Sequence, residues 1–197
     1  MEQKTRISHA RFIVVTAILS AVSYILMLLD FSVPFMPGFI KLDVSELPAL
    51  IGAFALGPVC GAAVCLVKNL LHLLVTTTGG VGELSNFLLG AVFTFTAGLI
   101  YMKNRTKKGA LLGSLIGAAV MAVLSVPINY FITYPFYMNL MPLDKIIAAY
   151  QAIFGGVNSL LSCLVVFNLP FTFLKGLLDA GLTALIYKRL SPIIKGK

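Results

Sequence analysis

The sequence has few charged residues and long runs without any. Only 11% of its 197 residues are charged and 59% are hydrophobic, with a mean hydropathy of +0.98. Several apolar runs approach the roughly 20 residues that a helix needs to cross a bilayer. These values exclude a soluble globular protein and predict an all-α integral membrane protein. The length allows one membrane domain over residues 1–197, with no room for a separate nucleotide-binding or catalytic domain.

The motifs of common enzyme families are also absent. The chain contains no HExxH, GxSxG or Walker sequence, and its serines have no paired base nearby in sequence. His9 and His72 lack a ligand or nucleophile partner at a useful spacing, so no metal site is expected. An intramembrane enzyme would have to be assembled from residues distant in sequence. It is the weakest interpretation, and we expect no catalytic residues.

Cysteines are few and are not arranged as ligands. Cys60, Cys65 and Cys163 lie in apolar segments without CxxC or Cys/His spacing. This pattern favours packed thiols over a metal site or a disulfide framework.

Acidic residues are scarce beside basic ones, with 7 against 15 and a net charge of +8. A basic chain can bind nucleic acid, but here the basic residues gather at the edges of apolar segments. The excess therefore reports membrane topology, and we expect no nucleic acid partner.

Six transmembrane helices are predicted, at about residues 10–29, 45–57, 59–76, 84–102, 110–133 and 170–190. The basic N-terminus resembles the start of a signal peptide, but the apolar run continues to Leu29 without a cleavage site, so we expect a retained first span. Ser45 is the expected N-cap of the second helix, with Pro48 in its first turn. Pro127 is expected to kink the fifth helix.

The segment before the last span is less regular. Gly155 and Gly156 divide it into two pieces too short to cross the membrane, and Asn168 with Pro170 is typical of a new helix start. We therefore expect short helices on the outer face at about residues 145–167.

Six crossings place the N-terminus, the Lys103–Lys108 loop and the C-terminus on one side. Only Glu2 among the acids lies there, with eleven of the basic residues: Lys4, Arg6, Arg11, Lys103, Arg105, Lys107, Lys108, Lys188, Arg189, Lys195 and Lys197. By the positive-inside rule this side is cytoplasmic. The long loops between helices 1 and 2 and between helices 5 and 6 would then face outward.

Polar residues form a stripe in the last predicted helix. Asn168, Thr172, Lys175 and Asp179 are four, three and four residues apart, a spacing that places them on one face. With a helix start near Pro170, Lys175 would lie about 8 Å and Asp179 about 14 Å below the outer surface. Ionisable groups at such depth are costly unless they are paired or line a cavity.

Two interpretations of this stripe remain open. Lys175 could extend to the outer interface while Asp179 pairs with it or with Lys68 to hold helices together. Alternatively the stripe lines a ligand site. Asn129, two residues after Pro127, could satisfy the carbonyl freed by the proline or contact the same ligand. A lysine, an amide and a hydroxyl together suit a polar heterocycle with carbonyl oxygens and ring nitrogens.

The first helix carries small residues at a recurring spacing. Ala17 and Ala21 form a small-xxx-small pair, which allows two helix backbones to approach closely. The pair could pack inside the bundle or form a docking face for another membrane subunit.

The sequence resembles a known family, the substrate-binding S components of energy-coupling factor (ECF) transporters. Within this family it resembles the type that binds riboflavin. The resemblance covers nearly the whole chain. It rests on Ala17 with Ala21 and on the segments "PFMPGFIKLDVSELPALIGAFALGP", "LVKNLLH", "NFLLGA", "INYF" and "PFTFLKG".

The resemblance implies a six-helix bundle in the bacterial plasma membrane that binds riboflavin on its outer side under the first loop. Such a protein joins a transmembrane T component and two ATPase subunits, with membrane lipid around it, and reorients to release its cargo. No cofactor is implied, since riboflavin is the transported ligand. Ala17 and Ala21 would then form the docking face.

The resemblance also assigns residues to the substrate site. Asn129 and Lys175 match residues that hold the polar edge of the flavin, and Phe39, Ile40 and Lys41 match the gating loop. Asn86 and Thr172 are also assigned to the substrate site. At position 172 the resemblance leads us to expect asparagine, whereas this sequence has threonine. Asp179 is expected to neutralise and orient Lys175. The aromatic candidates for ring packing are Phe39, Phe87, Phe131 and Tyr134.

Two further functions remain as alternatives. The chain could be an S component for another vitamin or small heterocycle. It could also be a stand-alone proton-coupled carrier that uses Lys175 and Asp179 as a relay.

Overall fold

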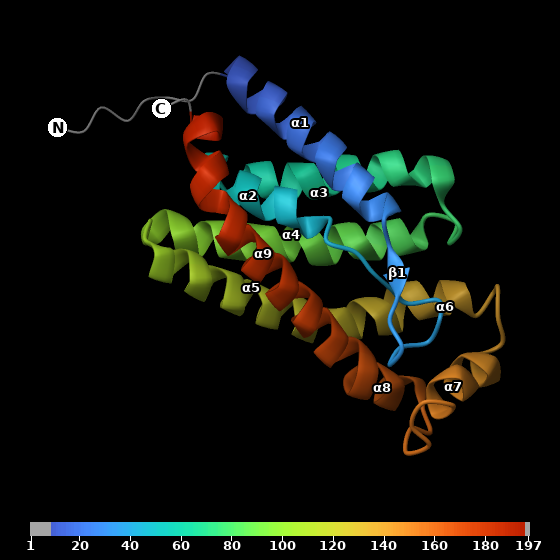
Figure 1. The fold of residues 1–197 in the computed structure, drawn as a ribbon. Coiled ribbons are helices and arrows are strands. Elements are labelled where there is room, and N and C mark those ends of the chain that lie inside the picture. The colour runs from blue at the N-terminus through green and yellow to red at the C-terminus, as the bar shows by residue number, and fades with distance from the viewer. Residues whose placement is uncertain (1–8, 196–197) are drawn as a thin grey trace.

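The computed structural model describes the backbone of residues 9–195 and the side chains of residues 9–187. Long helices pack into a bundle, and short elements cover one of its ends (Figure 1). Among the residues counted for orientation, Glu2, Lys4, Arg6 and Lys197 lie outside the described backbone. The side chains of Lys188, Arg189 and Lys195 lie outside the described side chains.

Five helical segments of the described chain are long and apolar enough to cross a membrane. They are His9–Leu28, Pro58–Val75, Val81–Lys103, Lys107–Tyr137 and Leu160–Tyr187, and a shorter apolar helix covers Glu46–Leu56. The first is α1 (His9–Leu28), and the third is α4 (Val81–Lys103). The protein is therefore a helical membrane protein.

Helix α2 (Glu46–Leu56) has eleven residues, about 16 Å along its axis, and is too short to cross alone. Gly57, at φ 110°, turns the chain into α3 (Pro58–His72), which ends in the 3-10 turn η1 (Leu73–Val75). Only glycine adopts this φ readily. Ser45 precedes α2 as predicted, but its side chain does not cap the helix. Its hydroxyl accepts a hydrogen bond from Lys68 instead.

The segment between α1 and α2 is a small hairpin rather than a plain loop. Strand β1 (Phe31–Ser32) pairs antiparallel with β2 (Lys41–Leu42), with Phe31 opposite Leu42. An ion pair of 3.0 Å between Lys41 Nζ and Asp30 Oδ1 joins the two ends of the hairpin. Residues Phe39 and Ile40 thus lead directly into β2, whose first residue is held by this ion pair.

Two of the long helices contain a π turn. Helix α5 (Lys107–Ile128) runs through Pro127 and continues as η2 (Asn129–Thr133) and α6 (Tyr134–Tyr137). Helix α8 (Leu160–Cys163) continues as η3 (Leu164–Asn168) and α9 (Leu169–Lys195). A π turn is rare, and it often marks a functional site.

The predicted start of the last helix near Pro170 was wrong. The helix begins at Leu160, after a capping box in which Ser159 and Ser162 bond each other's backbone N–H groups. The π turn η3 directly precedes α9, and its wider winding accommodates the ring of Pro170 without breaking the helix.

The earlier start of the last helix shortens the segment before it and places the polar stripe further along the helix. Of the predicted outer helices at residues 145–167, only α7 (Leu143–Gln151) is a separate short helix, because residues 160–167 belong to the last long helix. Lys175 follows Leu160 by fifteen residues, so it lies about 22 Å along the axis from the start of the helix. The predicted start near Pro170 had placed it about 8 Å from the helix start.

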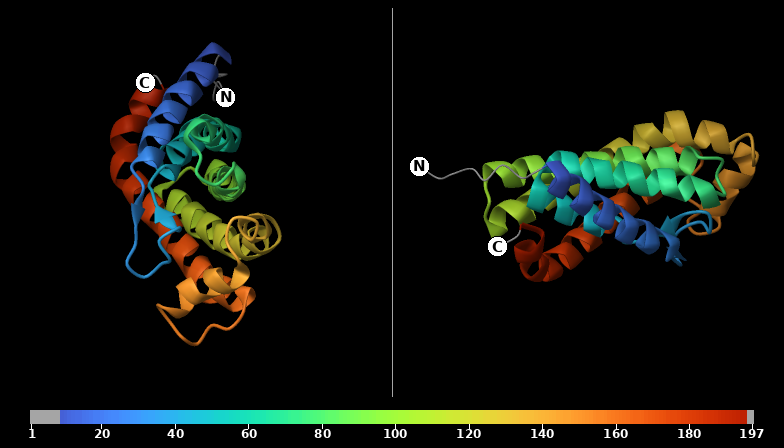
Figure 2. Two further views of the ribbon diagram at one scale, coloured as in Figure 1. Left: turned by 90° about the vertical axis from the view of Figure 1, so that its right-hand side faces the viewer. Right: turned by 90° about the horizontal axis from the view of Figure 1, so that it is seen from above.

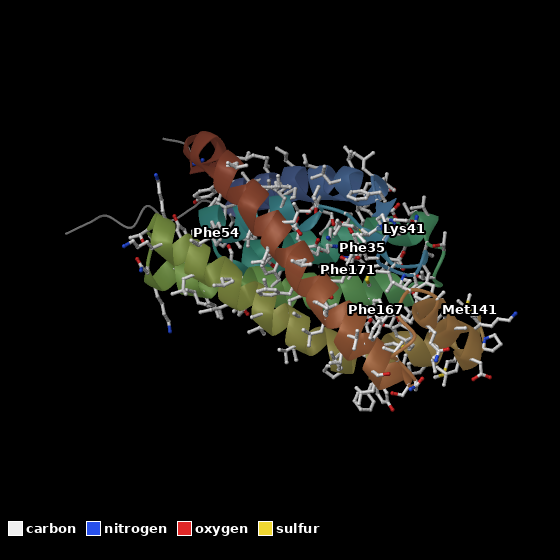
Figure 3. All side chains as sticks on the ribbon, turned by 60° about the horizontal axis from the view of Figure 1, so that its bottom comes forward. Phe35, Lys41, Phe54, Met141, Phe167 and Phe171 are labelled. Carbon is white, nitrogen blue, oxygen red and sulfur yellow. The ribbon has the colours of Figure 1, made fainter. Side chains whose placement is uncertain are left out.

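The two ends of the bundle differ. The start of α1, the α4–α5 connection and the end of α9 lie together at one end, and the hairpin, the α3–α4 connection and α7 lie at the other (Figures 1 and 2). We call these the basic end and the hairpin end. Figure 3 shows Phe54 toward the basic end and Lys41, Phe167, Phe171 and Met141 toward the hairpin end.

Buried side chains form three clusters. One lies at the hairpin end and joins the hairpin, α6, α7 and η3 through residues such as Met36, Tyr134, Tyr150 and Phe167. The other two lie among α1, α2, α3, α4, α5 and α9. Cys60, Cys65 and Cys163 are buried free thiols, as predicted.

Candidate functional site

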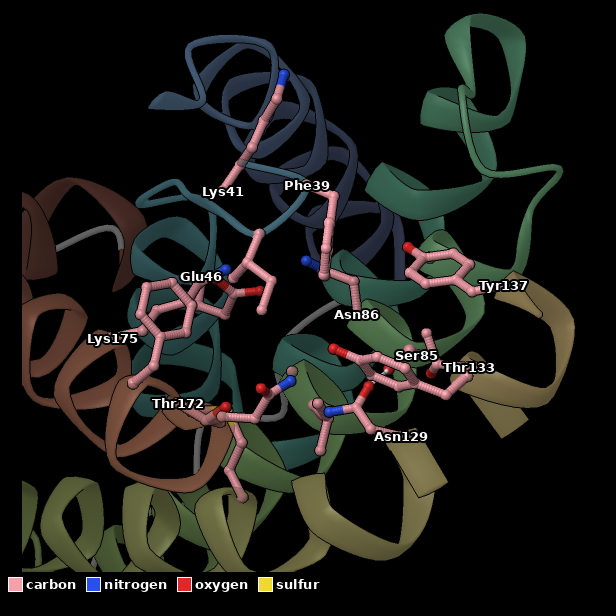
Figure 4. Close-up of a pocket in the computed structure, with 18 residues that line it drawn as sticks. Phe39, Lys41, Glu46, Ser85, Asn86, Asn129, Thr133, Tyr137, Thr172 and Lys175 are labelled. Carbon is pink, nitrogen blue, oxygen red and sulfur yellow. Dashed lines mark hydrogen bonds and ion pairs between the residues drawn. The ribbon is translucent and has the colours of Figure 1, made fainter. Parts of the chain in front are cut away.

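A cavity of about 180 Å³ opens at the hairpin end, between the hairpin, α2, α4, η2, α6, η3 and α9 (Figure 4). Elements from the first, middle and last thirds of the chain meet there. Seven of the eight predicted substrate-site residues line it: Phe39, Ile40, Lys41, Asn86, Asn129, Thr172 and Lys175.

The two π turns each bring an amide to this cavity. Asn129 is the first residue of η2 and Asn168 the last of η3, and both are at most 9% exposed. The Oδ1 atom of Asn129 lies 3.5 Å from the hydroxyl of Ser85, and Oδ1 of Asn168 accepts a hydrogen bond of 2.7 Å from Tyr150. With Oδ1 bound, each amide retains Nδ2–H donors for a ligand.

Lys175 belongs to a buried charge cluster with Asp43, Glu46 and Lys68. Its Nζ donates to Asp43 Oδ2 at 2.9 Å and lies 3.0 Å from Glu46 Oε2, an ion pair without hydrogen-bond geometry. Lys68 Nζ donates to Glu46 Oε1 at 2.6 Å and to the hydroxyl of Ser45. The cluster joins α9, α3, α2 and the loop between the hairpin and α2.

The charge of Asp43 is well stabilised. Burial alone would raise the pKa of Asp43, but the positive charge of Lys175, then that of Lys68, and a hydrogen bond from Ser45 outweigh burial and hold this pKa below its ordinary value. The loop before α2 is therefore anchored to α9 by an ionised carboxylate.

Asp179 does not bond Lys175 directly, as its predicted role would require. The side chain is fully buried but does not line the cavity, and neither carboxyl oxygen has a hydrogen-bond partner among the described residues. Asp43 and Glu46, rather than Asp179, hold Lys175, and Lys68 is bonded to Glu46 and Ser45. Helix spacing predicted an i,i+4 pair, whereas the loop and α2 supply carboxylates from outside the helix.

A chain of hydroxyl groups supports the site from the hairpin end. The hydroxyls of Tyr134 and Tyr150 bond each other, and Tyr150 also bonds Asn168. Phe39 meets the ring of Tyr150 edge-on, with ring centroids 6.0 Å apart. Burial and the neighbouring Tyr134 raise the pKa of Tyr150, so its hydroxyl stays protonated and able to donate. Helix α7 thus positions both Phe39 and a cavity amide.

Aromatic side chains line the cavity on several sides. Phe39 and Tyr134 were predicted candidates and lie there, together with Tyr137 and Phe171. Phe131 is instead 73% exposed, and Phe87 packs against the cluster of α1, α2 and α3.

Sequence reasoning missed several residues of the site. Glu46 could have been noticed as an acid at the start of an apolar helix, and Asn168 was placed on the polar stripe but not in the site. Ser85, Thr133 and Tyr150 carry no comparable signal, because their role depends on contacts between distant elements.

A helical membrane bundle with a buried polar cavity at one end is typical of a membrane transport protein. The sequence profile of the family described as "ECF transporter, substrate-specific component" matches residues 11–187. The chain belongs to this family.

Named relatives cover almost the whole chain. It is 33% identical to the riboflavin transporter RibU of Staphylococcus aureus over 98% of this chain and 97% of that protein. It is 30% identical to the riboflavin transporter FmnP of Bacillus subtilis over 93% of each. The RibU of Streptococcus thermophilus is 35% identical over 95% of this chain and 86% of that protein.

A solved structure supports the same assignment. It is described as "Structure and mechanism of the S component of a bacterial ECF transporter", and it superposes with a TM-score of 0.75 at 32% identity. The match covers 95% of this chain and 99% of that one. The protein is thus a transporter component of the cell membrane.

Proposed function

We propose that the cavity binds riboflavin and that the protein is the riboflavin-specific subunit of an ATP-driven ECF transporter. The observation that carries the proposal is the convergence of Lys175, two π-turn amides and the Phe39–Lys41 loop on one cavity. The relatives named as riboflavin transporters support the choice of cargo.

The cavity chemistry suits a flavin. The ring system of riboflavin combines a flat aromatic face with carbonyl oxygens and nitrogens along one edge. Asn129, Asn168 and Lys175 supply donors for that edge, with Thr172 and Asn86 beside them. Phe39 and its aromatic neighbours supply apolar surface for the face of the ring.

The cavity must enlarge to hold such a ligand. Its volume of about 180 Å³ lies below the roughly 300–1,000 Å³ of typical small-molecule sites. We propose that the hairpin is the element that moves, because only two residue pairs join its strands and its loop contributes Phe39 and Ile40 to the wall of the cavity. In this proposal it opens to admit riboflavin and closes over it, and Lys175 shares its donors between Asp43 and the ligand.

We further propose six crossings, with both termini cytoplasmic and the hairpin and α7 outside. Helix α2 is the sixth and shortest crossing. The hairpin and the buried charge cluster fill the rest of the membrane thickness on the outer side of α2. Lys103, Arg105, Lys107 and Lys108 at the basic end support this orientation.

The family supports the proposed partners. A transmembrane T component and two ATPase subunits would supply the energy, while lipid covers the remaining apolar surface. Ala17 and Ala21 are both exposed on α1, which favours a docking face over packing inside the bundle. Ile13, Ile18 and Ile25 extend this exposed surface.

Reconstitution tests the proposed transport. Proteoliposomes that hold this chain with its T component and ATPases should accumulate riboflavin only when ATP is present on the side of the membrane that carries the ATPases. An assembly with inactive ATPases should not accumulate riboflavin. Accumulation by the chain alone, driven by a proton gradient, would contradict the proposal.

A further inference from the structure

A second cavity lies at the basic end, away from the proposed riboflavin site. Its volume is about 570 Å³, and it is bounded by the ends of α2, α4 and α9, the α4–α5 connection and the start of α5. Nothing in the proposed capture of riboflavin uses it. We propose that this cavity binds one anionic phospholipid of the inner leaflet.

The polar rim of the cavity suits a phosphate group. Arg105 and Lys107 line it on either side of Thr106, the N-cap of α5. The first turn of α5 adds backbone N–H groups and the positive end of a 22-residue helix dipole. Two cations and a helix N-terminus at one rim give a site of strongly positive potential, and no acidic residue lines the cavity among the described residues.

A buried hydroxyl points to a ligand inside the cavity. Thr183 lines it and is only 1% exposed, yet its Oγ1 has no hydrogen-bond partner among the described residues. A buried hydroxyl without a partner is costly. The ester or glycerol oxygens of a lipid would supply the missing acceptor at this depth.

The interior of the cavity suits an acyl chain. Phe54 and Ala180 line it below the rim, and it reaches as far as Ser114. Ser114 lies seven residues after Lys107, about 10 Å deeper along α5. A ligand that fills the cavity must therefore be charged at the rim and mostly apolar below it, with a polar atom for Thr183.

Exposed apolar side chains flank the cavity. Leu111 on α5 and Leu185 on α9 line it, and they are 67% and 76% exposed. Such exposed leucines flank a lateral opening that a lipid can enter from the bilayer. A soluble anion would match the rim but would leave the apolar interior empty.

Native mass spectrometry of the purified full chain tests this directly. The protein is incubated with equal amounts of phosphatidylglycerol and phosphatidylcholine that carry the same acyl chains. We expect one phosphatidylglycerol to be retained over phosphatidylcholine by at least about threefold, since each basic residue near the surface attracts anionic lipid. Equal retention of the two lipids would overturn the proposal.

Matched charge variants separate a site from general attraction. The double variant R105Q/K107Q should lower the phosphatidylglycerol adduct by at least about fivefold. The control K103Q/K108Q removes the same charge at the ends of α4 and α5 beside that connection, but neither residue lines the cavity. It should change the adduct by less than about twofold. Equal losses in both variants would show only a diffuse positive surface and would overturn the site.

A cavity-filling variant tests the interior without changing charge. Ala184→Phe should displace the lipid, whereas Ala119→Phe, at an exposed position of α5 outside the cavity, should retain it. Gel filtration reports whether each variant stays folded. If Ala184→Phe is folded and keeps its lipid, the proposal is wrong.

Two other occupants are outcomes of the same tests. Displacement of the lipid by millimolar glycerol 3-phosphate or inorganic phosphate would indicate a site for soluble anions and contradict a lipid site. Loss of assembly with the T component in R105Q/K107Q, with the lipid adduct intact, would make the cavity a protein-docking surface instead. Neither readout depends on riboflavin, so this proposal and the proposed function can fail separately.

Discussion

Lys175 on α9 and Asp43 in the loop before α2 are 132 residues apart in sequence, and their side chains meet at 2.9 Å beside the cavity. This ion pair ties the last helix to the segment that connects the hairpin to the bundle. In the proposed function, a ligand bound at Lys175 would therefore be linked to the hairpin through Asp43.

Replacing Lys175 tests its role as a ligand contact. Lys175→Ala should weaken riboflavin binding by at least about tenfold, because a hydrogen bond to a charged group contributes about 1.5–3 kcal/mol. Flavin fluorescence quenching measures the affinity. The control is Lys145→Ala on α7, an exposed lysine at the same end that does not line the cavity. Similar affinity loss in both variants would argue against a specific contact.

Acid should weaken the attachment of the hairpin segment. The pKa of Asp43 in the folded protein lies below its ordinary value of 3.8, so its ionised form stabilises the fold. That stabilisation is fully present above about pH 4 and is lost as pH falls toward the lower, folded-state pKa. A thermal unfolding series from pH 7 downward should show a drop below about pH 4. Asp43→Asn should lower stability at pH 7 and reduce this acid-dependent drop; an unchanged acid profile would contradict the assignment.

The hydroxyl chain predicts a remote effect on binding. Tyr150→Phe leaves Asn168 Oδ1 and the Tyr134 hydroxyl without their shared partner, at a cost of about 1–3 kcal/mol. Because Asn168 lines the cavity, we expect weaker riboflavin binding together with a lower melting temperature. Tyr130→Phe, at a residue 39% exposed outside the cavity, is the matched control. Unchanged affinity in Tyr150→Phe would show that α7 does not position the cavity residues for binding.

The docking face predicts a separation of binding from transport. Ala17→Trp should leave riboflavin binding intact and abolish ATP-driven uptake, because a large side chain prevents close approach of a partner helix. Leu115→Trp, at an exposed position of α5, should leave both intact. Uptake that survives Ala17→Trp would show that the T component docks elsewhere.

Seven of the eight substrate-site residues that the sequence predicted line the cavity, because the chemistry of the polar ones is unusual in a membrane. A lysine, amides and a hydroxyl at depth have few roles other than pairing or ligand binding, and the resemblance placed Phe39, Ile40 and Lys41 beside them. The aromatic candidates were less reliable, since an apolar ring suits a cavity, the core and the lipid face equally.

The errors arose where long-range contacts override local signals. Gly155, Gly156 and Pro170 are typical breaks, yet a serine capping box and a π turn carry the last helix from Leu160 through the proline. The pairing of Lys175 with Asp179 followed from helix spacing. Its actual partners, Asp43 and Glu46, come from elements whose position no local pattern defines.

Titration of the purified chain with riboflavin tests the central claim most directly. We expect quenching of flavin fluorescence that saturates at one riboflavin per chain, and loss of that quenching in Lys175→Ala but not in Lys145→Ala. A folded wild-type protein that neither carries bound flavin nor quenches added riboflavin would contradict the proposed function.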